Sequence, residues 1–206
     1  MKSDSEMIRL GTSDIEWATN LLVEVFRDEP PLADMFRGPR REKHVKYFIR
    51  CSCAYALLFG EGYATPERDG VALWLLPGKT TMTPGRMFRA GMLSAPFRLG
   101  LNTFGRFMGF TQHADKIHKK FAPMPHYYLF MLGVCPAAQG KGVGGLLLAD
   151  MLSKVDLEGM PAYLETQNER NVGFYQKYGF EVAAEEPFPK LEGLRNWGML
   201  RGNVGQ

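Results

Sequence analysis

The stretch that decides the fold runs from residue 126 to residue 145 and reads HYYLFMLGVCPAAQGKGVGG. Residues 126–134 are apolar or aromatic almost throughout, which predicts a central strand buried on both faces. Residues 135–138 predict a connecting loop, and residues 139–145 a glycine-rich turn. Apolar positions at helical spacing then continue to about Glu158. The order is therefore strand, glycine-rich loop and helix.

Four glycines lie within the six residues from Gly140 to Gly145. Glycine inside a helix costs about 1 kcal/mol relative to alanine, so glycines in a first turn indicate that another group approaches the backbone closely. The N–H groups at a helix start have no intrahelical partner and lie at the positive end of the helix dipole. They favour a phosphate or pyrophosphate, with a tight packing turn between strand and helix as the simpler alternative.

Two other phosphate-binding motifs fit this loop less well. A Walker loop needs Ser or Thr after Gly-Lys, but Lys141 is followed by Gly142. The dinucleotide pattern G-x-G-x-x-G matches residues 140–145, and Glu165 follows 20 residues later. Its first glycine should lie at the strand tip, whereas five residues, one of them a proline, separate that glycine from Val134. A dinucleotide-binding protein is therefore a remote alternative.

The rest of the chain predicts a mixed α/β fold. Between about residues 78 and 125, Pro-Gly breaks and regularly spaced Met and Phe predict two or three short helices that cap the sheet, and Gly60–Gly62 predicts a break. We expect residues 1–206 to form a single domain that contains this insertion. Further strands are expected at 8–10, 63–65, 71–76, 162–165, 180–184 and 194–200, and further helices at about 14–26, 40–58 and 171–178.

Composition excludes several classes of protein. The chain has 25 Lys and Arg against 22 Asp and Glu, a formal net charge of +3, which is too small to indicate nucleic-acid binding. Residues 1–9 have no apolar core, and no apolar run is long enough to span a bilayer, so we expect a cytoplasmic protein with no membrane partner. Three irregularly spaced cysteines predict buried thiols, and no metal-ligand spacing is present.

Three segments resemble the GNAT acetyltransferase superfamily. Residues 132–144 (LGVCPAAQGKGVG) are similar to its motif A, which is a strand, Val-x-Pro, Gln/Arg-x-x-Gly-x-Gly/Ala and a helix. Residues 161–166 (PAYLET) and 170–180 (RNVGFYQKYGF) are similar to its second cofactor-side motif. With the tail RNWGM at 195–199, they look closest to the puromycin N-acetyltransferase branch. The resemblance covers about residues 126–201.

The resemblance implies a GNAT fold that binds acetyl-CoA. We expect a mostly antiparallel central sheet with flanking helices, in which strand 126–134 carries a bulge and diverges from strand 162–165. The glycine-rich loop would bind the pyrophosphate of coenzyme A, and the diverging strand would hold the pantetheine arm through its main chain. The residues implied to contact coenzyme A are Leu132, Gly133, Val134, Gln139, Gly140, Lys141, Gly142, Val143, Gly144, Gly145, Asn168 and Asn171.

The same resemblance implies transfer of an acetyl group to a primary amine of a small molecule by direct attack. Tyr175 lies in the family's Tyr position and is the expected general acid, since a phenol with a pKa near 10 is protonated at neutral pH. Glu165, at a strand end, is the expected base that holds the ammonium and removes its proton. His126 is a second candidate base, although a solvated strand end is the simpler interpretation of that residue.

The main alternative is a GNAT-like module that binds acetyl-CoA without turnover. Tyr175 and Glu165 favour an enzyme, but both are also compatible with an inherited scaffold. The identity of the amine, its relation to antibiotic resistance and the choice between monomer and homodimer do not follow from the sequence.

Overall fold

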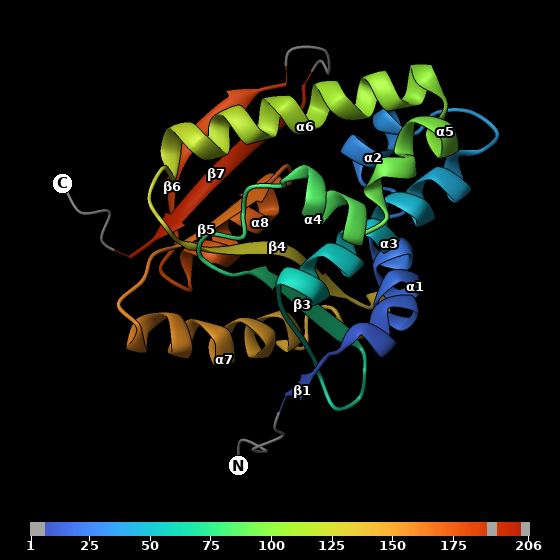
Figure 1. Cartoon of the computed structure of the whole chain (residues 1–206). Coiled ribbons are helices and arrows are strands. Elements are labelled where there is room, and N and C mark those ends of the chain that lie inside the picture. Colours follow the sequence, from blue (N-terminus) through green and yellow to red (C-terminus); the bar gives the residue numbers. More distant parts are fainter. Residues whose placement is uncertain (1–6, 189–192, 203–206) are drawn as a thin grey trace.

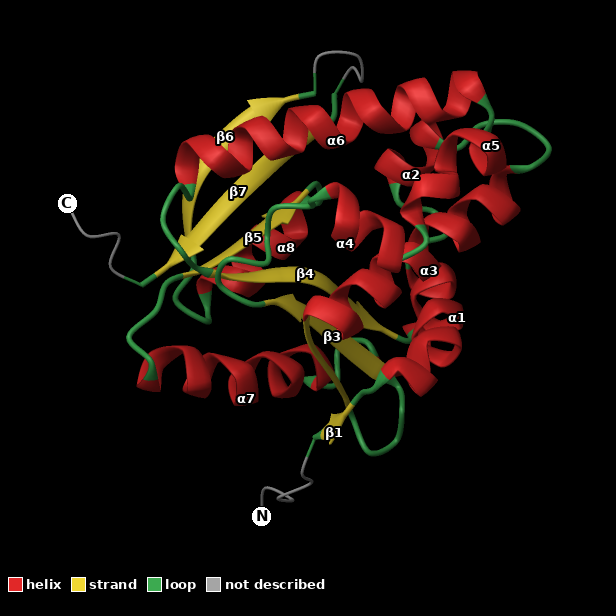
Figure 2. Ribbon diagram, viewed as in Figure 1, coloured by secondary structure: helices red, strands yellow, loops and turns green. Residues whose placement is uncertain are grey.

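A seven-stranded sheet crosses the molecule in the order β1-β2-β3-β4-β5-β7-β6 (Figures 1 and 2). The computed structural model describes residues 7–188 and 193–202. Most of residues 1–9, which were expected to lack the apolar core of a signal peptide, lie outside these ranges. Neighbouring strands are antiparallel except β4 and β5, which are parallel. The strands are β1 (Ile8–Arg9), β2 (Gly60–Ala64), β3 (Gly70–Leu75), β4 (Tyr127–Val134), β5 (Ala162–Thr166), β6 (Glu181–Pro187) and β7 (Arg195–Arg201).

Helices cover both faces of this sheet (Figure 1). One face carries α1 (Ile15–Val25), α2 (Pro30–Met35), α3 (Arg41–Phe59), α4 (Pro84–Arg89), α5 (Ala95–Leu99) and α6 (Leu101–Phe121). The other carries α7 (Val143–Leu157) and α8 (Glu169–Gln176). Short 3₁₀ turns lie at Thr12–Asp14, Met92–Ser94 and Pro136–Ala138. The mixed α/β class, the mostly antiparallel sheet and the helical insertion between β3 and β4 are confirmed.

The sheet separates two apolar cores. On the α1 face, Leu22, Ile49 and Leu73 are among the fully buried residues, and on the α7 face Trp74 and Leu148 are. Neighbouring residues of β3 therefore point to opposite cores, as the two-residue period of a strand requires. Every residue of β3 is buried, which makes it the most enclosed strand.

Strands β4 and β5 pair over only three residues and then diverge. Their last pair is Leu129 with Leu164, beyond which β4 stays paired to β3 and β5 stays paired to β7. A bulge lies at the same point, because Leu73 pairs with Met131 while Trp74 pairs with Leu129, which leaves Phe130 as an extra residue. The expected divergence and bulge are confirmed, and residues 130–134 of β4 have a free edge toward β5.

Three local predictions were wrong. No helix was expected at residues 30–35, but Pro30-Pro31 begins α2, since proline suits the first turn of a helix, where its missing N–H is not needed. Residues 60–62 were expected as a break but belong to β2, because β3 supplies pairing partners for all three. The cap holds the 21-residue helix α6 rather than only short helices.

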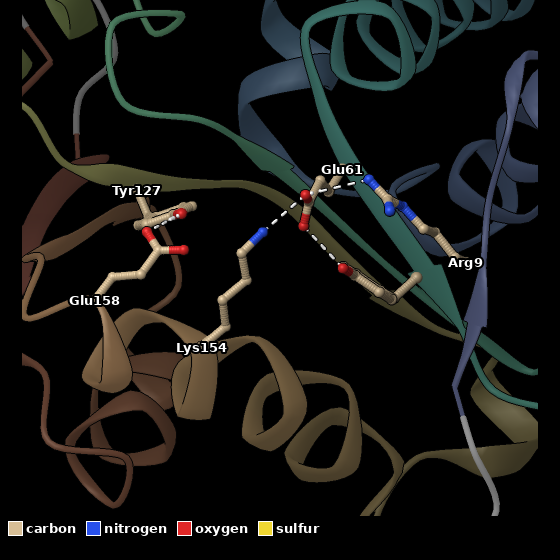
Figure 3. Close-up of polar contacts among 6 residues, drawn as sticks. Arg9, Glu61, Tyr127, Lys154 and Glu158 are labelled. Atoms are coloured by element: carbon tan, nitrogen blue, oxygen red, sulfur yellow. Dashed lines mark hydrogen bonds and ion pairs between the residues drawn. The ribbon is translucent and has the colours of Figure 1, made fainter.

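A buried carboxylate links α7 to the sheet (Figure 3). Glu61 of β2 is 8% exposed and accepts hydrogen bonds from Lys154 of α7 at 2.8 Å, from Arg9 at 3.2 Å and from Tyr63 at 2.8 Å. Burial alone would raise the pKa of Glu61, but these three partners outweigh it and lower the pKa below its usual value. The contact sets the position of α7, and therefore of the loop that precedes it.

We predict that Glu61→Gln lowers the free energy of unfolding by about 1–2 kcal/mol at pH 7, because it removes a buried charge that three donors stabilise. Since the folded-state pKa is lowered, this contribution is present above the ordinary carboxyl pKa and is lost as pH falls through the folded value. Urea unfolding at pH 7 and at pH 3 measures both effects. Glu67→Gln, at an exposed position, is the control, and equal midpoints for the two variants at pH 7 would contradict the prediction.

Candidate active site

The loop before α7 has a series of unpaired backbone N–H groups. Gly140 and Gly142 have φ angles of +76° and +85°, and nothing lies within 4 Å of the position of a Cβ on either residue. Within residues 7–188 and 193–202, no group accepts a hydrogen bond from the backbone N–H of residues 140–144. Residues 139–142 are exposed, and Lys141 adds a positive charge. An exposed, positively polarised loop of this kind suits an anion.

The next two glycines are explained by packing against α8. A Cβ on Gly145 would lie 1.9 Å from the Tyr178 hydroxyl oxygen, and one on Gly144 would lie 3.3 Å from Phe174. A pair of aromatic side chains therefore approaches Gly144 and Gly145 closely, and contact of these two residues with coenzyme A stays a prediction. Val143 packs from this turn toward β3, where its side chain would meet a Cβ on Gly70 at 2.9 Å.

The free edge of β4 leads into this loop. Leu132 and Val134 belong to the apolar layer on the α7 side, whereas Gly133 faces α1, where a Cβ would lie 2.6 Å from Leu22. The Gln139 side-chain amide donates to the Val134 carbonyl oxygen at 3.1 Å and so closes the loop back onto the strand. The structure thus joins the expected strand positions and the loop amides into one continuous polar edge.

Asn168 and Asn171 both lie around Thr166, at the end of β5. The Asn168 side chain caps α8 by accepting from the Arg170 backbone N–H at 3.1 Å. The Asn171 side-chain amide donates to the Thr166 hydroxyl at 3.3 Å. Their contacts in the described structure hold the start of α8, and contact with coenzyme A stays a prediction for both.

Tyr175 points from α8 into the core on the α7 side. It is 8% exposed and belongs to the same apolar cluster as Leu129 and Leu164, the last paired residues of the diverging strands. Burial raises the pKa of its phenol, so the hydroxyl stays protonated at neutral pH. No hydrogen-bond partner of this hydroxyl occurs among the residues that the structure describes. The hydroxyl oxygen is not one of the fully buried polar atoms that lack a partner, so it keeps some contact with solvent.

Glu165 lies just beyond the last β4–β5 pair, on the opposite face of β5. Its carboxylate accepts from the Tyr163 hydroxyl at 2.9 Å and from the Asn196 side chain at 3.1 Å, and Gln167 fixes Asn196 by donating to its oxygen at 2.6 Å. Burial raises the pKa of Glu165 to about 7, although the two donors lower it. A carboxyl with this pKa can gain and lose a proton near neutral pH.

The sequence analysis did not identify Tyr163 and Asn196, the partners of Glu165. Tyr163 lies two residues before Glu165 on the same strand, so both side chains share a face. Asn196 lies in the tail that was quoted for the resemblance, but only the β5–β7 register, with Glu165 opposite Gly198, brings it to the carboxylate.

His126 is buried rather than solvated, which corrects the simpler interpretation of that residue. Its Nε2 lies 2.7 Å from Nε2 of His118, and its Nδ1 lies 2.6 Å from the Met124 carbonyl oxygen. Since a carbonyl only accepts, the Nδ1 of His126 carries its proton and His118 donates between the two rings. The His118 ring stacks on Tyr163 at a centroid distance of 4.7 Å, so α6 is joined here to the face that carries Glu165.

The His118–His126 pair also borders a hollow of about 220 Å³ between the end of α6 and the loop after β3. Burial lowers the pKa of both histidines, that of His118 to about 4. The pair is therefore neutral at pH 7. The sequence analysis did not identify His118, because helical periodicity does not show which strand a helix will cover.

Two other structural features are missing from residues 7–188 and 193–202. No cluster of three or more His, Cys, Asp or Glu side chains is arranged to hold a metal ion. No helix in the described ranges is both long and apolar enough to cross a membrane.

The fold and site define a mixed α/β protein with diverging parallel strands beside an open helix N-terminus. Known proteins with similar sequences or structures are acetyltransferases by description. The acetyltransferase (GNAT) domain family matches residues 102–182. An uncharacterized N-acetyltransferase of Schizosaccharomyces pombe is 24% identical over 183 residues, covering 84% of this chain and 72% of that protein.

Other relatives match over less of their length. The mycothiol acetyltransferase of Renibacterium salmoninarum is 39% identical over 93 residues, 42% of this chain but only 26% of that protein. A Corynebacterium glutamicum structure described as histone acetyltransferase HPA2 and related acetyltransferase has a TM-score of 0.67 at 19% identity, covering 97% of each chain. The matched domain family and these relatives are all described as acetyltransferases, which supports an acetyl-transferring enzyme.

We predict that the neutral histidine pair makes the protein sensitive to acid. Because the folded-state pKa of His118 lies below its unfolded value near 6.5, its contribution is present above pH 6.5 and is lost as pH falls toward 4. The loss between pH 7.5 and pH 5 should be about 2 kcal/mol. Glu165 opposes this trend, because its raised pKa favours the folded state as pH falls.

Urea midpoints of the wild type and of His118→Gln at pH 7.5 and pH 5 isolate the histidine contribution, because Glu165 is common to both proteins. The variant should lose less stability on acidification. Exposed Gln112→His serves as a control for an added solvated histidine. The same pH dependence in the wild type and His118→Gln would show that the histidine pair does not lower the free energy of unfolding on acidification.

Proposed function

We propose that this enzyme transfers the acetyl group of acetyl-CoA to a primary amine of a small molecule, by direct attack within the gap between β4 and β5. The observation that carries the proposal is the adjacency of two features: the free edge of residues 130–134 and the unpaired N–H groups of residues 140–144. An extended arm with a diphosphate at one end requires both.

The fit to coenzyme A rests on this chain's own groups. The amides of residues 140–144 and the Lys141 ammonium would hold the diphosphate, and the main chain of Leu132–Val134 would pair with the pantetheine amides. Coenzyme A supplies the acetyl group as a thioester. The open space at Gly140 and Gly142 is compatible with this fit, since no side chain covers those two positions.

The two proposed catalytic groups lie on opposite faces of β5. Tyr175, on the α7 side, would donate a proton to the departing thiolate, since a protonated phenol is the correct form for an acid. Glu165, on the α6 side, would take the proton of the attacking ammonium directly or through one water. The separation suits direct transfer, because the leaving sulfur and the attacking nitrogen need different partners at the same time.

The raised pKa of Glu165 helps to explain how a charged amine could react. A lysine-like amine with a pKa near 10.4 costs about 4.6 kcal/mol to neutralise at pH 7, whereas an α-amine near 7.8 costs about 1 kcal/mol. A carboxylate with a pKa of about 7 can remove the proton of either amine and release it to solvent at neutral pH.

Calorimetric titration with coenzyme A and acetyl-CoA tests the proposal. We expect binding of both, and about tenfold weaker binding by Lys141→Glu, because the reversed charge repels the diphosphate. Lys177→Glu is the matched control at another exposed position. Absence of heat with either ligand would refute the proposal, and binding without thiol release across a panel of amines would identify a non-catalytic module.

We predict that Tyr175→Phe lowers kcat at least about tenfold and leaves the affinity for coenzyme A and the melting temperature nearly unchanged. The physical reason is that the hydroxyl donates to no described residue, so its loss removes an acid without breaking a contact. Steady-state rates with thiol detection measure the effect, and Tyr178→Phe is the matched tyrosine control. Unaltered turnover would exclude Tyr175 as the acid.

We predict that kcat/KM rises with pH through an apparent pKa near 7, because Glu165 must be ionised to accept a proton. Glu165→Gln should lower kcat/KM at pH 8 by about a hundredfold and remove this part of the profile. Glu181→Gln, at an exposed site on β6, is the control. A pH profile with the same inflection in Glu165→Gln would assign the base to another group.

A further inference from the structure

The cap carries positive charge that nothing in the described chain neutralises. No Asp or Glu occurs between Gly70 and Ala114, although the whole chain has 22 acidic residues. Five cations lie in this interval, namely Lys79, Arg86, Arg89, Arg98 and Arg106. None of them forms an ion pair with any residue in the ranges 7–188 and 193–202.

The same segment exposes large apolar side chains. Of the eight large apolar residues exposed in the described structure, five lie between residues 82 and 101. Phe97 is 89% exposed, Leu101 is 82% exposed and Phe88 is 70% exposed. Single exposed apolar residues are ordinary, but a concentration of them within 20 residues marks an interaction surface.

The local structure turns these side chains outward. Residues 92–99 form a 3₁₀ turn that continues into α5, so Leu93 and Phe97 lie four residues apart on one side, while Ala95 and Leu99 are buried on the other. Gly100, with a φ of +75°, then redirects the chain so that Leu101 begins α6. The buried side chains therefore attach this segment to the core, and the outward apolar side chains take no part in that packing.

A basic hollow of about 590 Å³ adjoins this surface at α4. Its polar lining includes Lys79, Arg86 and Arg89, and its apolar floor includes Phe59. The guanidinium carbons of Arg86 and Arg89 lie 5.9 Å and 5.2 Å from the centroid of the Phe59 ring, which holds both groups beside the hollow. Such a site suits a phosphate-bearing headgroup next to an apolar phase.

We propose that this surface, the cap patch, docks on an anionic lipid membrane. The cap patch comprises the cations Lys79, Arg86, Arg89 and Arg98 and the apolar residues Phe88, Leu93, Phe97 and Leu101. The cations contact negatively charged headgroups, while Phe97 and Leu101 insert at the boundary of the acyl chains. This inference is independent of the proposed acetyl transfer.

The positive charge of the cap patch argues against a second copy of the chain as its binding partner. In a two-fold symmetric dimer through this surface, each basic patch would face its own copy, and like charges would repel. An acidic protein would also neutralise the positive charges. The apolar side chains protrude rather than line a groove, however, which favours a lipid layer into which they can insert. The sequence analysis argued against a membrane partner, because no single helix in this stretch has a clean basic face; the patch instead combines residues of several short helices.

Co-sedimentation with vesicles tests the proposal. We expect the intact protein to bind vesicles of phosphatidylcholine mixed with phosphatidylserine, to bind pure phosphatidylcholine vesicles far less, and to be released by salt. Phe97→Ser/Leu101→Ser should weaken binding at least about tenfold, because it removes the inserting side chains. Lys79→Gln/Arg89→Gln/Arg98→Gln should weaken it about a hundredfold, at about fivefold per charge.

Matched controls lie elsewhere on the surface. Leu157, on α7, is 89% exposed like Phe97, and Lys177 is exposed near the end of α8, so Leu157→Ser and Lys177→Gln should bind as the wild type does. Unchanged melting temperatures confirm that the variants fold. The proposal is overturned by equal binding to both vesicle types, by binding that the patch variants do not weaken, or by a concentration-dependent dimer that Phe97→Ser/Leu101→Ser abolishes in the absence of vesicles.

Discussion

The structure depends on the point at which β4 stops pairing with β5. A parallel pair normally continues as long as both strands do, because each lost hydrogen bond leaves a polar group without a partner. Here the pairing ends at Leu129 and Leu164, and the extra residue Phe130 turns β4 away while its other edge remains paired to β3. The free edge is stable only in contact with water or another extended chain, so the gap suits an extended ligand.

Elements on both faces of the sheet converge on this gap. On one face, α8 brings Tyr175 to the core beside Leu164, and the network around Glu61 positions α7 and its loop. On the other face, Tyr163, Asn196 and Gln167 orient Glu165, and the histidine pair connects this face to α6. The two proposed catalytic side chains, Tyr175 and Glu165, thus lie on opposite sides of one strand.

Local sequence signals identified the strand, loop and helix from residue 126 to Glu158, because buried runs, glycines and apolar periodicity are local properties. They did not reveal that His118 meets His126 or that Asn196 meets Glu165, since these contacts depend on which strand α6 covers and on the β5–β7 register. The glycine signal was also ambiguous. Gly140 and Gly142 serve the turn, whereas Gly144 and Gly145 make room for Phe174 and Tyr178. Pro30-Pro31 showed that proline can begin a helix as readily as end one.

The contact between Tyr178 and Gly145 couples two parts of the enzyme mechanically. With the hydroxyl of one seated where a methyl group of the other would be, α8 cannot shift toward α7 without collision. Tyr175 lies near the end of α8, and Tyr178 follows in the turn after that helix, so this contact ties the end of α8 to the first turn of α7. A larger side chain at residue 145 therefore needs either a smaller side chain at residue 178 or a displaced tyrosine ring.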